Sequence, residues 1–252
     1  MGQGVDLSEQ RGPLAQRHPW ETARAEVVVG TLRRVELQRP RILDIGCGDG
    51  FLLEQLCRRL GCASAVGQDI HLSEQQAEQL SRPGLRFVRR LETIEGERFD
   101  LMLLLDVLEH VQEPQELLER ARRLHLAPGG RVLISVPAFQ GLFSDHDRAL
   151  HHFRRYSRQQ ISDVALASGL KVQASGYWFS SLLLPRALTV VKEKLLPVQR
   201  SKTLGVGAWR APAWATRALH HALCFDQRIT EWAQERAGLV IPGLSAWLLC
   251  SE

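Results

Sequence analysis

An acid and three evenly spaced glycines follow an apolar run near the start of the chain. The stretch RILDIGCGDGFLLEQL covers residues 41–56, with Asp44 in the apolar run and Gly46, Gly48 and Gly50 after it. A strand, a glycine turn and a helix in this order bring backbone N–H groups up to a polar or anionic ligand. Glycine lets the ligand approach without a Cβ in the way. The stretch therefore predicts a ligand-binding turn.

The spacing of the glycines argues against a dinucleotide ligand. A dinucleotide-binding turn reads G-x-G-x-x-G, whereas this chain reads D-I-G-C-G-D-G from Asp44 onward. Cys47 lies inside the turn, where a small side chain is needed, and is interpreted as a spacer and not as a nucleophile. Asp69 lies at the end of the run 63–70, where an acid holds a ribose diol in Rossmann-like folds. The two stretches together predict a nucleoside-containing ligand.

A second group of reactive side chains follows the run RVLISVP. His146, Asp147, His151, His152 and Tyr156 fall within eleven residues. Histidine or aspartate is the usual general base for a hydroxyl nucleophile, and ligands of open α/β sheets bind where such segments leave the strands. The segment is therefore predicted to bind substrate, with His146, Asp147, His152 and Tyr156 as catalytic candidates. The alternative is a polar loop that only caps the next helix.

Neighbouring residues extend this prediction. Arg154 and Arg155 suit a phosphate or carboxylate and suggest an anionic substrate, unless they pair with Asp147 or another local acid. His110, after the run 98–107, is a further catalytic candidate that either faces the ligand or only starts a helix. No acidic cluster accompanies the histidines, so no metal site is predicted.

Apolar runs and helical patterns alternate along the chain, which predicts a parallel sheet with helices on both faces. Strands are expected at 42–45, 63–70, 85–88, 98–107, 131–137, 171–179 and 244–250. Helices are expected at 20–37, 51–60, 113–127 and 157–168, and Ser73 with Gln76 is expected to open another.

The composition is that of an ordinary globular protein. The chain has 252 residues, of which 44% are apolar and 24% charged, and its net charge is +4. That charge is too small to argue for nucleic-acid binding, and no nucleic-acid partner is expected. The five cysteines are scattered and form no C-x-x-C pair, which fits a reducing cytoplasm. Neither a signal segment nor a membrane-spanning helix is predicted.

Four stretches in this order, ILDIGCGDG, VGQDI, FDLMLLLDVLEHV and LAPGGRVLISVP, resemble the class I S-adenosylmethionine-dependent methyltransferases. This group includes quinone-biosynthesis O-methyltransferases, and the resemblance covers about residues 20–180. It implies a Rossmann-like α/β fold with a seven-stranded, mostly parallel sheet, a helical insertion before the last strand, and that strand running antiparallel. It also implies S-adenosylmethionine as the cofactor, across the carboxyl ends of the strands.

The resemblance assigns cofactor contacts by position. It places the methionine end of the cofactor at Asp44, Gly46, Cys47, Gly48 and Gly50, the ribose at Asp69, the adenine at Ile70, and the methyl group near Asp106 and Val107. Asp44 is expected to receive the ammonium of the methionine moiety. Many relatives carry an aspartate near the adenine amine. This chain has Arg90 and Leu91 there, so a backbone contact at one of them is expected instead.

Two further stretches are similar to a bacterial methyltransferase subgroup of undefined substrate. The first, HPWETAR, has the pattern H-x-W-x-x-x-R at His18, Trp20 and Arg24, and the second is HDRALHHFRRYS. Trp20 and Arg24 are therefore substrate candidates, together with Arg154 and Arg155 of the second stretch. The alternative for Trp20 is that it only fastens its helix to the body.

The chain divides into an N-terminal segment with a capping helix (1–37), an S-adenosylmethionine-binding Rossmann-like domain (38–179), a helical insertion (180–243) and the last strand (244–252). The insertion is rich in basic residues and tryptophan. It is interpreted as a lid over the site, a homodimer face, or a peripheral membrane contact through residues 180–235.

The sequence thus predicts a cytoplasmic S-adenosylmethionine-dependent methyltransferase, either free or peripheral to the inner face of the membrane. The predicted reaction is O-methylation of a small or lipid-linked anionic substrate. A non-catalytic S-adenosylmethionine-binding scaffold with the same fold is the alternative. An NAD-linked oxidoreductase is disfavoured by the glycine spacing.

Overall fold

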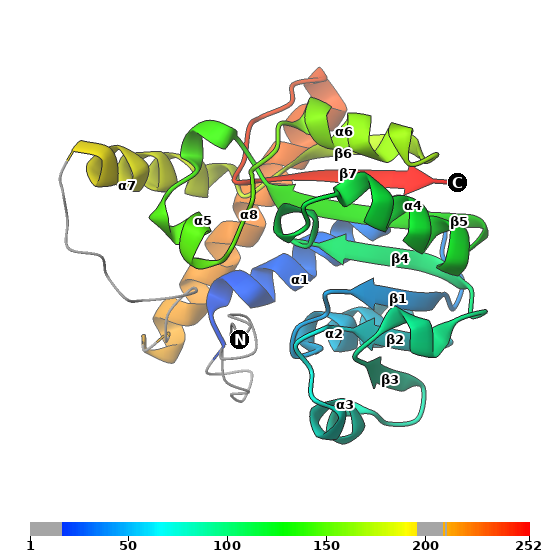
Figure 1. Cartoon of the computed structure of the whole chain (residues 1–252). Helices are drawn as coiled ribbons and strands as arrows, with labels where there is room; N and C mark the ends of the chain where they lie inside the picture. Colours follow the sequence, from blue (N-terminus) through cyan, green and yellow to red (C-terminus); the bar gives the residue numbers. More distant parts are fainter. Residues whose placement is uncertain (1–16, 196–208, 210) are drawn as a thin grey trace.

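Seven strands form one sheet in the order β3-β2-β1-β4-β5-β7-β6. The computed structural model describes residues 17–195, 209 and 211–252 (Figure 1). β7 runs antiparallel to both of its neighbours, whereas the pairs from β3 through β5 are parallel. The predicted seven-stranded, mostly parallel Rossmann-like sheet is confirmed. The expectations for residues 1–16 and 196–208 lie outside the described residues.

The strands are short apart from β5. Their bounds are β1 Arg41–Ile45, β2 Ser64–Gln68, β3 Leu85–Val88, β4 Phe99–Leu105, β5 Leu126–Pro137, β6 Lys171–Trp178 and β7 Ser245–Ser251.

β4 lies in the middle of the sheet, and both of its faces are covered. Leu101 and Leu103 belong to one core cluster, whereas Met102 and Leu104 belong to the other. All four side chains are fully buried. Because successive side chains of a strand point to opposite faces, the unbroken run FDLMLLL can fill two cores at once.

Two helical layers cover the sheet (Figure 1). The first core cluster takes side chains from α1 (Pro19–Leu32), α2 (Phe51–Leu60), α3 (Glu74–Leu80) and α8 (Ala213–Ala237). The second takes them from α4 (Pro114–His125) and α6 (Arg158–Ala167). Short 3-10 turns follow several strands and are η3 Leu91–Ile94, η4 Leu108–His110, η5 Gln140–Leu142 and η6 Ser180–Leu182.

Local capping fixes the start of two of these helices. The Ser73 hydroxyl accepts from the Gln76 backbone N–H at 3.1 Å, and the Gln76 side chain accepts from the Ser73 N–H at 2.9 Å. Ser157 and Gln160 make the same reciprocal pair before α6. These two capping boxes satisfy N–H groups that would otherwise lack a partner.

Several element boundaries differ from the predicted ones. α1 ends at Leu32 and not near residue 37, because the N–H groups of Arg34 and Val35 bond carbonyls three residues back in a tighter turn. β5 begins at Leu126 and shifts register against β4 at Gly129-Gly130, where Gly129 has a φ of +73°. β2 and β4 end before Asp69 and Asp106, so these acids lie on turns at the sheet edge.

The insertion contributes two helices, α7 (Leu183–Leu195) and α8. In Figure 1, α7 projects beyond α5 (Asp145–Ala149) on the side to which the arrowheads of β1 and β4 point, and α8 packs against α1. Within the described residues, none of the helices combines the length and the apolar character needed to span a bilayer.

Candidate functional site

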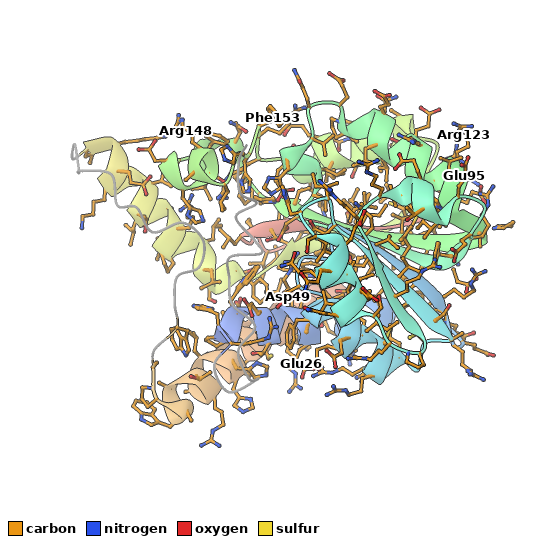
Figure 2. The ribbon with its side chains drawn as sticks, turned by 60° about the horizontal axis from the view of Figure 1, so that its bottom comes forward. Glu26, Asp49, Glu95, Arg123, Arg148 and Phe153 are labelled. Carbon is orange, nitrogen blue, oxygen red and sulfur yellow. The ribbon has the colours of Figure 1, made fainter. Side chains whose placement is uncertain are left out.

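A cavity of about 1160 Å³ lies at the carboxyl ends of the parallel strands. Its wall includes the turn after β1, residues that follow β2 and β4, the start of α1, the segment 146–155 and part of the insertion. In Figure 2, Asp49 lies beside α1 and Phe153 lies on the segment after α5, and both residues line the cavity. This is the sheet edge at which open α/β proteins bind ligands.

The glycine turn leaves backbone exposed on one wall of the cavity. The N–H of Gly46 donates to the Gln68 carbonyl at 2.7 Å, which ties the turn to the end of β2. Gly46 has a φ of +75°, and a Cβ there would lie 2.5 Å from Val107 Cγ2. Gly48 has a φ of +56°, and a Cβ there would meet no atom within 4 Å. Gly46 is therefore required by packing, and Gly48 presents bare backbone to the cavity.

Two acids stand beside this turn in different environments. Asp44 is 2% exposed, and burial raises its pKa to about 7, although the Arg24 charge opposes the shift. Asp69 accepts the N–H of Gly48 at 2.9 Å and the N–H of His71 at 2.8 Å. The Asp69 carboxylate therefore holds the turn in place as well as lining the cavity.

The end of β4 is connected to α1 by an ion pair. Arg24 Nη2 lies 2.8 Å from Asp106 Oδ2, and the Ser135 hydroxyl donates to Asp106 Oδ1 at 3.2 Å. The guanidinium also lies over the Trp20 ring, 5.1 Å from its centre. Trp20, Arg24 and Asp106 all line the cavity, so the structure brings predicted substrate and cofactor residues together.

Asp147 is the centre of a buried hydrogen-bond network. It is 0% exposed and accepts from His152 Nδ1 at 3.0 Å, Arg155 Nε at 2.8 Å, Arg186 Nη2 at 2.9 Å and the Ser144 N–H at 3.0 Å. Burial alone would raise the pKa of Asp147. The His152 hydrogen bond and the Arg155 charge outweigh it and hold that pKa far below its ordinary value. Asp147 thus stays ionised and holds the side chains of His152, Arg155 and Arg186 in place.

The histidines of the segment line the cavity around this network. Because His152 Nδ1 faces Asp147, its Nε2 is left to point elsewhere. The His152 ring packs edge-on against His110, with ring centres 4.6 Å apart. Burial and, next, the charge of Arg186 lower the pKa of His146. The neutral form of His146 is therefore favoured.

Glu109 joins His110 and His152 in a group that was not predicted from the sequence. Their ligand atoms all lie within 4.8 Å of one another, close enough to hold a metal ion. Glu109 is 0% exposed and supplies the acid that appeared to be missing beside the histidines. The missing acid was one of the reasons against a metal site, and this geometry removes that reason.

Two predicted residues lie outside the cavity, and a third, Arg155, pairs with Asp147 as the alternative from the sequence allowed. The Tyr156 hydroxyl donates to the Leu108 carbonyl at 3.0 Å in the second core cluster, outside the cavity lining. Arg154 donates to the Gln112 carbonyl at 2.9 Å and also lies outside the lining. Arg155 lines the cavity, but its charge is matched by Asp147. Tyr156 as a catalytic group and Arg154 as a substrate ligand are therefore corrected, because neither side chain reaches the cavity.

The predicted adenine side is open to the cavity. Ile70 is 65% exposed, and it lines the cavity together with Arg90 and Leu91.

Two residues that contribute to the site were not predicted from the sequence. Arg17 bonds Asp49 of the glycine turn at 2.5 Å, and Arg186 reaches Asp147 from the insertion. Both pairs join residues far apart in the sequence, so no local pattern marks them, whereas the acid at Glu109 next to His110 was a readable signal.

The sheet order and the cavity at its carboxyl edge define the class I methyltransferase fold. The chain belongs to the methyltransferase domain family, whose profile matches residues 20–175. Residues 20–175 thus form an S-adenosylmethionine-dependent methyltransferase domain.

Characterised relatives align with part of the chain. The ubiquinone biosynthesis O-methyltransferase of Cereibacter sphaeroides (strain ATCC 17029) is 41% identical over 105 residues, which are 38% of this chain and 40% of that enzyme. The enzyme of the same name from Xylella fastidiosa is 29% identical over 134 residues, 51% of this chain and 53% of that one. The chain therefore matches about half, or less, of the length of these relatives.

The fold is shared over a longer span. A crystallised methyltransferase from Archaeoglobus fulgidus superposes with a TM-score of 0.52 at 17% identity, covering 92% of this chain and 97% of the other. At this identity the likeness concerns the fold alone.

Proposed function

We propose that this methyltransferase acts on a hydroxyl oxygen of a small or lipid-linked acceptor, with His152 as the general base. The pair of His152 and Asp147 carries the proposal. An imidazole that donates from Nδ1 to an ionised carboxylate presents Nε2 as a proton acceptor. A hydroxyl needs such a base as it becomes a nucleophile, and His152 lines the cavity.

In this proposal the glycine turn and the strand-end acids hold S-adenosylmethionine, which supplies a methyl group on a sulfonium. The residues present fit that molecule. Gly48 leaves its backbone bare toward the cavity, and the buried Asp44 carboxylate suits an ammonium. Asp69 has acceptor capacity left for ribose hydroxyls beyond its two N–H contacts. Ile70 offers an exposed apolar surface on the predicted adenine side.

The rest of the cavity favours an acceptor with an apolar body. Leu150 of the loop and Leu182, Leu219 and Leu223 of the insertion contribute to the wall. A cavity of about 1160 Å³ has room for a second molecule beside the cofactor. The anionic acceptor expected from the two arginines has less support, because Arg155 is already matched by Asp147.

The chain's own residues contribute position and proton transfer. The two arginines and the Ser144 N–H fix Asp147, which orients His152 and stabilises the imidazolium that forms when Nε2 takes the acceptor proton. The apolar wall keeps the site poor in water, and the loop holds the acceptor near the bound cofactor. Because the sulfonium methyl donor is already reactive, methyl transfer requires mainly that donor and acceptor are positioned correctly.

Methyl transfer from labelled S-adenosylmethionine to cell extract, followed by mass spectrometry of the product, tests the proposal. His152→Ala is expected to lower kcat by about 10² or more while leaving cofactor affinity unchanged, because a general base contributes about 10²–10⁴. The control is His221→Ala, an exposed histidine on α8 outside the cavity lining.

Two results would contradict the proposal. If a chelator abolishes transfer and a divalent ion restores it, His152 acts with Glu109 and His110 as a metal ligand and not as the base. If S-adenosylmethionine binds by calorimetry but no extract accepts a methyl group, the scaffold alternative gains support.

A further inference from the structure

The outward faces of α7 and α8 carry most of the exposed apolar side chains of the described protein. Among all the described residues twelve large hydrophobic side chains are exposed, and eight of them belong to these two helices. They are Leu184, Leu188, Val191 and Leu195 on α7 and Trp214, Phe225, Ile229 and Trp232 on α8. Such a concentration indicates an interaction surface.

The spacing puts each set on a single helix face. On α7 the residues recur at intervals of four, three and four, and on α8 Trp214, Phe225, Ile229 and Trp232 recur at eleven, four and three. With 3.6 residues per turn, each series stays within a narrow stripe along its helix. These stripes, one on α7 and one on α8, are called the outer stripes below.

The opposite sides of the same helices are already occupied by the protein. Val190 of α7 is buried, and Arg186 bonds Asp147. Leu219 and Leu223 of α8 line the cavity. In Figure 1 the left end of α7 and the lower end of α8 both extend beyond the side of the sheet to which β1 and β4 point. The outer stripes therefore flank the edge of the sheet where the cavity lies.

The charges around the outer stripes are mainly positive. Lys192, Lys194, Arg217, Arg228 and Arg236 are exposed. Arg217 and Arg228 each lie three residues after an exposed aromatic side chain and so share its face.

Most acids of the two helices are held by partners in the body. Glu235 lies 3.1 Å from Arg34, and Asp226 accepts the Ser181 N–H at 3.2 Å. The charge presented outward is thus basic, beside leucine and tryptophan.

We propose that the outer stripes of α7 and α8 dock on an anionic lipid bilayer, with both helices lying in the headgroup region. Tryptophan and leucine enter the acyl boundary, while lysine and arginine stay with the anionic headgroups. A second copy of the chain fits less well, because a twofold contact would bring the same cations against each other. Docking goes beyond the proposed reaction and does not depend on the identity of the acceptor.

Docking in this way would hold the cavity close to the bilayer surface. Leu182, which directly precedes α7, and Leu223 of α8 extend the apolar wall of the cavity to the two helices that carry the outer stripes. An acceptor with a hydrocarbon tail could then pass from the bilayer to the cavity without crossing water, a route that a lid over a soluble substrate would not need.

Sedimentation of the full chain with vesicles tests the docking surface. The vesicles are phosphatidylcholine with and without phosphatidylglycerol, at low and at high salt. We expect binding to the anionic vesicles that weakens at high salt. Leu188→Glu and Trp232→Ala, alone and combined, should weaken it at least tenfold.

A matched control uses an exposed leucine elsewhere on the surface. Leu166 of α6 is 55% exposed, against 61% for Leu188, and lies outside the outer stripes. Leu166→Glu should bind vesicles as the unmodified chain does. Calorimetry with S-adenosylmethionine confirms that each variant is folded.

Three results would overturn the docking proposal. These are equal sedimentation of the Leu188→Glu variant and the unmodified chain, equal binding to neutral vesicles, and a stable dimer that Leu188→Glu dissociates. Failure of the proposed reaction gives a different result, with vesicle binding intact and methyl transfer absent or independent of His152.

Discussion

Asp44 should make cofactor affinity depend on pH between 5 and 7. Burial raises the pKa of this carboxyl from 3.8 to about 7 in the free protein. If Asp44 receives the ammonium of the cofactor, the complex needs the ionised form. Binding below pH 7 must then first remove a proton, and each unit of pH costs about 1.4 kcal/mol.

The size of the effect follows from the fraction ionised. At pH 8 most free protein already carries the charged carboxylate, whereas at pH 5 only about 1% does, given a pKa of about 7. The ionised fraction falls from about one half at pH 7 to about 1% at pH 5, so the dissociation constant should rise by about 50-fold over that interval, roughly 2.3 kcal/mol. An α-amino group of ordinary pKa near 8 stays protonated between about pH 5 and 7. The pH dependence of binding in this range therefore comes from groups of the protein and not from the ligand.

Calorimetric titration with S-adenosylhomocysteine at several pH values measures this dependence. Asp44→Asn should bind weakly with an almost flat profile, and subtracting its profile removes contributions from the cavity histidines. Equal slopes for Asp44→Asn and the unmodified protein between pH 5 and 7 would refute the reasoning.

The same shift affects the stability of the free protein. A carboxyl whose folded pKa lies above its unfolded pKa stabilises the fold at low pH. That contribution is lost as pH rises from about 4 toward 7, because the unfolded chain ionises more readily. The free energy of unfolding of Asp44→Asn should lack this part of the pH dependence.

Gly46→Ala should lower the free energy of unfolding by roughly 2–4 kcal/mol, because it adds left-handed strain and a clash with Val107. An unchanged urea midpoint would contradict it. Tyr156→Phe should cost about 1–2 kcal/mol by leaving the Leu108 carbonyl without its donor, yet keep kcat within about twofold. A large loss of kcat would restore Tyr156 as a catalytic candidate. Asp147→Asn should destabilise by about 3–5 kcal/mol in thermal denaturation, since two buried arginine contacts lose their counter-charge. A melting temperature equal to that of the unmodified protein would count against the network.

The fold could be predicted because its signals are local. The run FDLMLLL specifies a strand buried on both faces, and Ser157 with Gln160 specifies the start of α6. The turn around Gly46 and Gly48 could also be predicted, since the positive φ angles that it needs are those that glycine adopts easily.

The part of the cavity that would hold the methyl acceptor was harder to predict from the sequence, because it depends on side-chain direction and on partners distant in the chain. Tyr156 and His152 lie in one short segment, yet one side chain turns into the core and the other into the cavity. Spacing along a loop without regular periodicity does not determine such a choice. Arg186 reaches Asp147 from across the insertion, and a contact over that sequence separation leaves no pattern in the chain.

The contact between Arg186 and Asp147 gives α7 an effect on the chemistry. One side of the helix supplies a cation to the buried carboxylate that orients His152, and the other side carries the outer stripe. A shift of α7 that withdraws Arg186 would raise the proton affinity of Asp147 and loosen the orientation of His152. Attachment at the outer stripe and occupancy of the cavity then share a coupling free energy. By linkage, each must change the affinity of the other by the same factor.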